Sequence, residues 1–386
     1  MTDNDTVNRP DWTAAARRLL GDDLIVRSDA DRTVAIGDTT ARVRLWPPDA
    51  TIEHVRTVRA LHDRVPDRAG VPAPVGNVDV AVLVGGRVFD ACTVLEGLPL
   101  NRHGMFTVEG YGAVAIPLHE TADHGDILAQ AARLLGMVHQ ASRDHIDQER
   151  TGAFSARDLH TATRLSWQEA RKSLGRQAEA LVEVRRWLRC GNRVIPIADD
   201  RLRAAGDDAT GTPVLIHGDI WPARLMVDEP SRPRTLHGID GWTMAAAGSP
   251  VIDVAALCAR ITGWSAANVE AVLGAYSEHA DLSPGARRLV PVVAAVDLLN
   301  QLGRLLEIAF LDDWVADDPA QPFVRGGIAV LLRSLEHLTD VLAPPEPGGR
   351  GPGGPRRGGP PRTPPGRTRA SGRSPRPSGR RPREAG

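Results

Sequence analysis

Two stretches of sequence decide the fold: residues 214–228 read VLIHGDIWPARLMVD, and residues 235–257 read TLHGIDGWTMAAAGSPVIDVAAL. Apolar residues 225–227 and 235–239 flank a Glu-Pro-Ser-Arg-Pro turn, which predicts a β-hairpin. A hairpin returns the chain on itself, so we expect Asp219 and Asp240 to lie close together at one end of it. Two carboxylates in one cleft suit metal–nucleotide chemistry, in which one handles a hydroxyl proton and the other holds Mg²⁺ against phosphates.

The sequence before these stretches predicts a small antiparallel sheet that ends near residue 96. Short alternating apolar runs separated by turn residues indicate strands, and apolar residues at helical spacing in 11–22 and 51–65 indicate two helices. The expected strands are Leu24–Arg27, Thr33–Ile36, Ala41–Trp46, Val78–Val84 and Val88–Leu95.

The sequence from residue 97 to residue 343 reads as mostly helical, because its apolar residues recur every three to four positions. The predicted fold is therefore α+β and two-lobed: an N-terminal lobe over 1–96, a larger helical lobe over 97–343, and a tail over 344–386. The expected helices are Ile127–Gln140, Thr161–Arg189 with a break near Gly175, 251–263, 266–279, 285–310 and Gly326–Leu342.

The tail differs sharply in charge from the rest of the chain. It carries eleven arginines and two acids, a net charge of +9, so the remaining residues carry −10 of the overall −1. Its Pro, Gly, Arg and Ser composition predicts disorder, because it has too few apolar side chains to offset the entropy of ordering. Its arginines either bind phosphate polymers or are simply solvated, and the composition favours the second interpretation.

Several protein classes are excluded by missing motifs. The three cysteines have no C-x-x-C spacing, which fits a reducing cytoplasm. The polar first ten residues predict no signal peptide, and no apolar run reaches the length that spans a bilayer. There is no Gly-Lys-Ser/Thr loop, no H-E-x-x-H, no G-x-S-x-G and no sequence-specific nucleic-acid module. We therefore expect a cytoplasmic protein without a membrane or specific nucleic-acid partner.

The order HGD, short loop, hairpin, ID and then G-x-P-x-x-D resembles aminoglycoside phosphotransferases and their small-molecule kinase relatives, which have a protein-kinase-like fold. The resemblance covers about residues 20–340 and is concentrated in 214–257. It implies that Asp219 of the His217-Gly218-Asp219 loop is the base that accepts the substrate hydroxyl proton. It also implies that Asp240 is the metal ligand and that Asp253 braces the catalytic loop, with His217 in a structural role.

The same resemblance extends to other parts of the chain. ARVRLWPP (41–48) is similar to the strand that carries a basic residue to the phosphates, which implies Arg44 in that role. TVLEGLPL (93–100) is similar to the hinge between lobes, where the backbone of Glu96 and Leu98 would bind the adenine edge. The implied reaction moves the γ-phosphate of ATP or GTP, with Mg²⁺, to a hydroxyl of a small molecule such as an aminoglycoside-like antibiotic or a metabolite.

Three positions depart from the family pattern. Arg224 stands where relatives have an asparagine as a second metal ligand, and a guanidinium has no acceptor to offer a metal. Glu53, the nearest acid that could pair with Arg44, is about one residue out of place. Gly241 follows Asp240 where relatives often have an aromatic residue, and we interpret Trp242, one residue later, as its replacement. The alternative function is therefore a catalytically degenerate, kinase-like binding protein.

Each assignment also has a plainer interpretation. Asp219 and Asp240 can be turn residues beside glycines, and Arg44 can be an exposed strand residue. Acids in 312–318 either attract a cationic substrate or belong to a solvated loop, and the second interpretation is favoured. The sequence does not indicate the oligomeric state, the substrate, or the choice between ATP and GTP.

Overall fold

The computed structural model describes the residues 11–28, 32–66, 70–76, 81–101, 105–108, 112–115, 117–118, 124–146, 153–177, 181–206, 211–310 and 321–343. The chain divides into two units, Met1–Ala343 and Pro344–Gly386, and all described residues belong to the first. The tail that the sequence predicts to be disordered and the acids of 312–318 lie outside the described residues. The predicted boundary at residue 96 stays a prediction.

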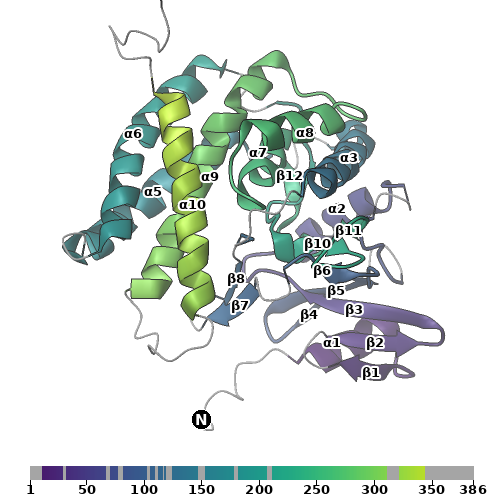
Figure 1. Ribbon diagram of the computed structural model, residues 1–386. Helices are drawn as coiled ribbons and strands as arrows, with labels where there is room; N and C mark the ends of the chain where they lie inside the picture. The colour runs from purple at the N-terminus through teal and green to yellow at the C-terminus, as the bar shows by residue number, and fades with distance from the viewer. Residues whose placement is uncertain are drawn as a thin grey trace, which may run out of the picture. The chain divides into compact units, whose positions relative to one another are not determined.

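A five-stranded antiparallel sheet forms the N-terminal part, in the order β1-β2-β3-β5-β4 (Figure 1, purple). Strand β3 mixes buried apolar and more exposed polar residues, whereas the five central residues of β5 are all buried. The predicted sheet is confirmed, with the fourth strand shorter than expected because 77–80 lie outside the described residues. The strands are β1 (Ile25–Ser28), β2 (Thr33–Ile36), β3 (Thr39–Leu45), β4 (Val82–Val84) and β5 (Arg87–Thr93).

Two helices accompany this sheet. Helix α1 (Trp12–Leu20) begins at Asp11, whose carboxylate accepts a hydrogen bond from the Ala14 amide, and it packs Ala15 and Ala16 against the sheet core. Helix α2 (Ile52–His62) is capped in the same way by Thr51. The side chains of Val55, Val58 and Leu61 on α2 belong to the larger core, which extends into the helical part. Helix α2 therefore connects the two halves of the protein.

The hairpin predicted at 225–239 is confirmed. Strands β10 (Leu225–Val227) and β11 (Leu236–Ile239) pair antiparallel, with Leu225 opposite Ile239. Strand β6 (Leu98–Pro99) joins β10 as a third strand, and β9 (Val214–Ile216) pairs with β12 (Ala246–Gly248). A further pair is formed by β7 (Met105–Val108) and β8 (Gly112–Ala115).

Helices make up most of the C-terminal part, as the periodicity predicts. The predicted break near Gly175 is confirmed, because a short turn there separates α5 from α6. Helices α5, α6, α9 and α10 pack together as one group in Figure 1. The helices are α3 (Gly125–Ser142), α5 (Ala156–Leu174), α6 (Val182–Ala204), α7 (Pro250–Arg260), α8 (Ala266–Tyr276), α9 (Pro284–Phe310) and α10 (Gln321–Leu342).

Helix α9 is the central element of the helical core. Among the described helices it is the one long and apolar enough to cross a membrane, but 78% of its apolar window is buried inside the protein. Its neighbours α5, α6, α7 and α10 cover it. Its apolar character is therefore explained by its central position in the helical core.

Candidate active site

The catalytic loop predicted from the sequence leaves β9 and turns sharply at Gly218. This glycine has a φ of 75°, and a Cβ atom here would lie 2.8 Å from the Met244 carbonyl oxygen. A residue with a side chain is therefore excluded both by conformation and by space. The turn directs the next residue, Asp219, away from the buried strand, so that its side chain remains 28% exposed.

Asp253, in the first turn of α7, holds this loop in place through hydrogen bonds with its backbone. Its buried carboxylate accepts hydrogen bonds from the amides of His217 (2.6 Å) and Gly218 (2.9 Å), and His139 lies 3.4 Å away. Burial alone would raise the pKa of Asp253, but the hydrogen bond and charge of His139 outweigh it, and the pKa is lowered. Asp253 therefore braces the loop as an ionised group.

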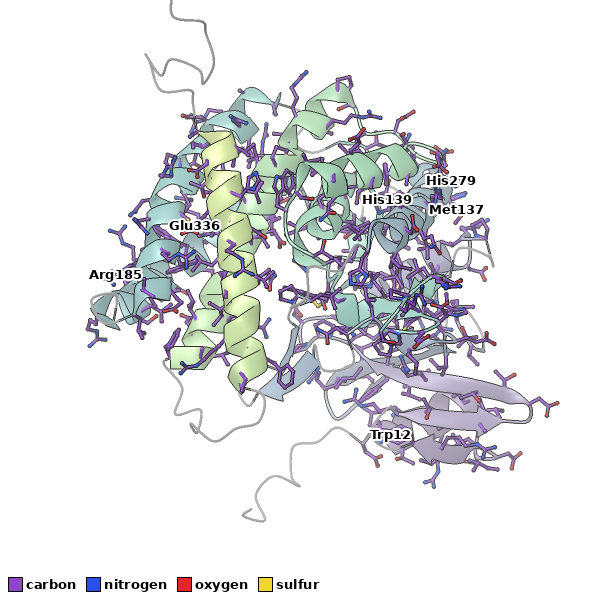
Figure 2. All side chains as sticks on the ribbon, in the orientation of Figure 1. Trp12, Met137, His139, Arg185, His279 and Glu336 are labelled. Atoms are coloured by element: carbon purple, nitrogen blue, oxygen red, sulfur yellow. The ribbon has the colours of Figure 1, made fainter. Side chains whose placement is uncertain are left out.

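His139 anchors the same carboxylate to the helical core. It lies on α3 (Figure 2), and its Nδ1 atom is 2.9 Å from the Tyr276 hydroxyl of α8. All three side chains are buried. A chain of hydrogen bonds therefore runs from the α3–α8 contact through Asp253 to the backbone of the catalytic loop.

His217 connects the catalytic loop to the end of the hairpin. Its Nδ1 atom accepts from the Asp219 amide (3.1 Å), so its Nε2 atom carries the proton and donates to the Asp240 carbonyl oxygen (2.9 Å). Burial lowers the pKa of His217, which keeps the ring neutral in this arrangement. Trp242, fully buried, packs against the ring with centroids 4.6 Å apart. Both histidine nitrogens are thus used for structure.

The Asp219 carboxylate lies among three donors. Its Oδ1 atom accepts from Trp221 Nε1 (3.0 Å), its Oδ2 atom accepts from Arg224 Nη2 (3.1 Å), and Arg260 Nη1 lies 3.7 Å from Oδ1. A carboxylate has about four acceptor positions, so these contacts orient Asp219 without saturating it. A partly exposed, oriented carboxylate can accept a proton from a bound hydroxyl group.

Asp240 lies at the end of β11, and its loop is attached to the catalytic loop. Its amide donates to the Arg224 carbonyl oxygen (2.8 Å), next to the His217 contact already described. Its Oδ1 atom accepts from the Gly241 amide (2.8 Å), while its Oδ2 atom forms an ion pair with Arg42. The Arg224 side chain completes the connection, since it bonds Asp219 and also lies against Gly241.

The basic residue of β3 that reaches Asp240 is Arg42, whereas the residue predicted to meet the phosphates is Arg44. Arg44 is buried and pairs with Asp90, directly opposite on β5, through its Nε (2.9 Å to Oδ1) and Nη2 atoms. Asp90 also accepts from Trp46 and Arg59. The interpretation of Arg44 as an exposed strand residue is therefore wrong.

The acid expected to pair with Arg44 is also corrected. Glu53 is exposed on α2, whereas Asp90 is completely buried. Burial alone would raise the pKa of Asp90, but the charges and hydrogen bonds of Arg44 and Arg59 outweigh it and lower the pKa. The sequence did contain a signal for this pair, because Asp90 interrupts the apolar strand RVFDACT.

The hinge residues lie beside the hairpin. Leu98 pairs with Val227 through β6, and Gly97 adopts a φ of 93° with no room for a Cβ atom against the Val227 carbonyl. Glu96 contributes to a cavity of about 420 Å³. That cavity is bounded by the end of α2, residues 70–74, residues 93–96 and His237. The contacts of Glu96 and Leu98 with a nucleotide remain predictions.

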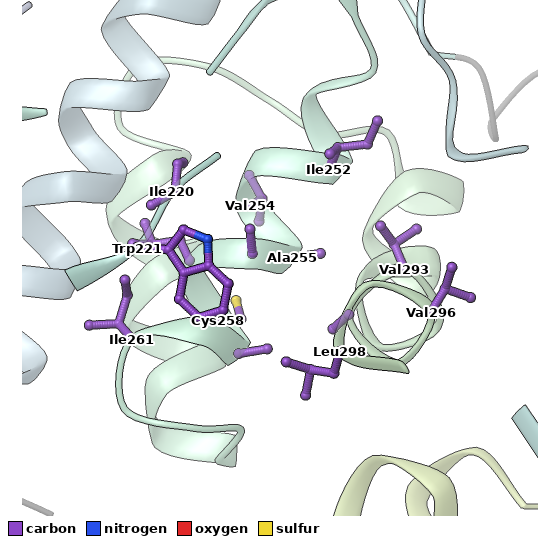
Figure 3. Packing of buried hydrophobic residues seen from close by; sticks show 14 of the residues in the cluster. Ile220, Trp221, Ile252, Val254, Ala255, Cys258, Ile261, Val293, Val296 and Leu298 are labelled. Carbon is purple, nitrogen blue, oxygen red and sulfur yellow. The ribbon is translucent and has the colours of Figure 1, made fainter. Parts of the chain in front are cut away.

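The sequence did not predict a second buried ion pair, Arg260–Asp297, which lies next to the catalytic loop. Arg260, at the end of α7, is buried and donates from Nε to Asp297 of α9 (2.6 Å), and its guanidinium lies 4.8 Å from the Trp221 ring centre. Figure 3 shows Trp221 packed beside α7 with Ile220 and Ile261 nearby. A single acid within the apolar run of α9 was the sequence signal, because buried acids are normally paired.

Asp240 is the acid at this site that could hold a metal ion together with phosphate oxygens. No group of three or more His, Cys, Asp or Glu side chains able to hold a metal occurs among the described residues. Mg²⁺ needs fewer protein ligands when a nucleotide supplies phosphate oxygens, and one carboxylate such as that of Asp240 is then sufficient. Arg224, in the place of a second protein ligand, offers donors alone.

Together, the N-terminal antiparallel sheet and the mostly helical C-terminal part define a protein-kinase-like fold. The chain belongs to the phosphotransferase enzyme family, whose sequence model matches residues 24–290. A search of curated proteins found no significant match.

One solved structure supports the fold, and a second is similar with a lower score. An aminoglycoside phosphotransferase from Alicyclobacillus acidocaldarius is similar over 86% of this chain and 94% of its own, with 13% identity and a TM-score of 0.55. A macrolide 2′-phosphotransferase from Brachybacterium faecium matches over 87% and 97%, with 20% identity and a TM-score of 0.42. At 13% identity, the first of these likenesses concerns the fold alone.

Proposed function

We propose that this chain transfers the γ-phosphate of ATP or GTP to a hydroxyl group of a small molecule, with Asp219 as the base. The observation that supports this most strongly is the linkage of the Asp219 and Asp240 loops through His217 and Arg224. In this proposal the partly exposed Asp219 carboxylate acts next to a second acid, Asp240, which would hold the metal–nucleotide complex.

Asp219 is the residue that receives the proton in this proposal. The substrate hydroxyl oxygen attacks the γ-phosphorus while the bond from phosphorus to the leaving nucleoside diphosphate oxygen breaks. The hydroxyl proton passes to the free acceptor position of Asp219, and Trp221 and Arg224 keep the carboxylate oriented. Mg²⁺ held by Asp240 would neutralise phosphate charge when bound.

Arg42 is the β3 residue that we assign to the phosphates, in place of Arg44. It is paired with Asp240 in the structure and its side chain is 26% exposed, so a triphosphate can compete for it. Arg44 already has a buried carboxylate partner, and its role is to hold β3 against β5. The backbone of Glu96 and Leu98 would bind the base of the nucleotide.

The substrate is proposed only as a class: an antibiotic or metabolite with a free hydroxyl, in the cytoplasm. The acids of 312–318 lie outside the described residues, so attraction of a cationic substrate stays a prediction. The alternative is a kinase-like protein that binds nucleotide without transferring phosphate. Arg224 favours this alternative, because its guanidinium pairs with the base itself.

The decisive experiment compares wild type, Asp219→Asn and the control Glu53→Gln, which removes an exposed acid from α2. Each protein is incubated with Mg²⁺ and ATP or GTP against a panel of hydroxylated amines and sugars, and product is detected by mass spectrometry. Losing a general base is expected to lower kcat by about 10³-fold while nucleotide affinity stays within about twofold.

Three outcomes separate the candidates. Transfer by wild type and control but not by Asp219→Asn supports the proposal. Equal transfer by Asp219→Asn contradicts the role of Asp219. Nucleotide binding without transfer by wild type to any of the panel favours the binding protein.

A further inference from the structure

The position of the Arg224 backbone places its side chain between Asp219 and Gly241. Arg224 ends a short helical turn, Pro222–Arg224, where its amide donates to the Trp221 carbonyl oxygen (2.9 Å). Its own carbonyl oxygen accepts from the Asp240 amide (2.8 Å). These two bonds fix the residue to the Asp219 side and to the Asp240 side of the site at the same time.

The guanidinium fills the space where the two loops meet. Its Nη2 atom donates to Asp219 Oδ2 (3.1 Å), and it lies directly over Gly241. A Cβ atom on Gly241 would lie 2.5 Å from Nη1 and 2.6 Å from Cζ of Arg224. The glycine that follows Asp240 is therefore matched to the arginine: its missing side chain makes the room that the guanidinium occupies.

One buried atom of Arg224 has no partner. Its Nε atom is buried and makes no hydrogen bond in the part of the chain that the structure describes. Burying a cationic donor without a hydrogen-bond partner costs free energy, unless a ligand or a nearby charge compensates for it. The side chain as a whole is only 19% exposed, so it is held in the site and does not extend into solvent.

Both acids of the site already have cationic partners. Asp240 is paired with Arg42, and Asp219 lies within 3.1 Å of Arg224 and 3.7 Å of Arg260. A guanidinium stays cationic in proteins and cannot act as a metal ligand. A divalent ion bound between Asp219 and Asp240 would lie against that charge without gaining a ligand from residue 224.

We propose that the Arg224 guanidinium takes the place of a second metal ion, so that this chain binds its nucleotide with one divalent cation. The inference rests on the proposed function, since it concerns the same nucleotide site. In this arrangement Asp240 holds the one cation together with the phosphates, and Arg224 supplies the fixed positive charge on the Asp219 side. Arg224 then marks a one-metal site and not a damaged two-metal site.

The test counts bound Mn²⁺ by electron paramagnetic resonance in the presence of the non-hydrolysable analogues of ATP and GTP. Wild type is expected to bind one Mn²⁺ per chain at saturating nucleotide, and Arg224→Asn is expected to bind two. Arg224→Lys keeps the charge and should stay at one. Arg232→Asn, which removes an exposed arginine from the tip of the same hairpin, is the matched control and should also stay at one.

The outcomes distinguish this inference from the function beneath it. Two Mn²⁺ ions in wild type would overturn the inference alone, and this result does not depend on any variant folding. A folded Arg224→Asn that binds nucleotide with one Mn²⁺ would also overturn it. No binding of either analogue by wild type would overturn the proposed function, and the inference with it.

Discussion

Strand β3 carries two arginines that form ion pairs of very different kinds. Arg44 pairs with Asp90, 46 residues away, and both side chains are at most 3% exposed. Arg42 pairs with Asp240, 198 residues away, and these side chains are 26% and 16% exposed. The first pair is sealed within the sheet, whereas the second joins the sheet to the candidate active site and is open to exchange with a ligand.

The difference teaches how one strand can serve both stability and function. A buried charge that loses its partner stays in a medium of low polarity, so its pair is expensive to break. A partly exposed pair can be exchanged for contacts with water or phosphate at little cost. We therefore expect Arg44–Asp90 to be structural and Arg42–Asp240 to be exchangeable.

The largest expected effect comes from breaking the buried pair. Asp90→Asn leaves Arg44 and Arg59 without their carboxylate and should lower the free energy of unfolding by about 3–5 kcal/mol. Asp240→Asn, which breaks the open pair, should cost at most about 1 kcal/mol. Urea unfolding followed by circular dichroism measures both. Equal losses in the two variants would remove the distinction between the pairs.

Breaking the Arg42–Asp240 pair is expected to have a smaller effect, and only on nucleotide binding. Arg42→Gln should weaken nucleotide binding about tenfold, a change of about 1.4 kcal/mol, because one cation at the phosphates is lost. Its unfolding free energy should stay within about 1 kcal/mol of wild type. Arg27→Gln, an exposed arginine of β1 in the same sheet, is the control for binding measured by calorimetry. Unchanged affinity in Arg42→Gln would show that another group meets the phosphates.

The smallest effect concerns the pH dependence of stability that arises from His62, whose buried ring lies near the Arg44–Asp90 pair. His62 of α2 is buried, packs edge-on against Trp242, and neither ring nitrogen has a hydrogen-bond partner among the described residues. Burial lowers the pKa of His62 well below 6.5, and the charges of Arg44, His217 and Arg59 add to this against the opposing Asp90. The unfolded chain therefore binds a proton at a higher pH than the folded protein does.

The stability from neutral His62 is fully present above pH 6.5 and is lost as the pH falls below it. This loss amounts to about 1 kcal/mol between pH 6.5 and pH 5.5. His62→Leu should remove that part of the acid sensitivity, as measured by unfolding at the two pH values. His337→Gln, at an exposed histidine of α10, should leave it unchanged. An unaltered pH dependence in His62→Leu would show that the ring is protonated or solvated in the folded protein.

Much of the fold was predictable because its signals are local. Apolar residues at helical spacing located α3, α7, α8, α9 and α10, and short apolar runs between turn residues located the strands of the N-terminal sheet. The hairpin was predictable because two short apolar runs flank a proline-containing turn. The association of the Asp219 and Asp240 loops follows from that hairpin, and the hydrogen bonds between them agree with it.

The partners of charged side chains were less predictable. Arg42 and Arg44 lie two residues apart and so face the same side of β3, and alternation does not distinguish which reaches the site. The register of β3 with β5 decides it, because Arg44 stands opposite Asp90 while Arg42 stands opposite Cys92. The Arg260–Asp297 pair was missed for a related reason, since it depends on how α7 packs against α9.

The sequence by itself determined the family pattern of acids, the order of strands and helices, and the presence of a cation at position 224. These depend on residue type and on spacing over a few residues, which the chain carries wherever it folds. Only the tertiary structure decided which arginine faces Asp240, which acid neutralises Arg44, and that the Arg224 guanidinium lies between Asp219 and Gly241. Those choices depend on burial and on contacts between distant segments, because a charge selects its partner only after packing has removed water from around it.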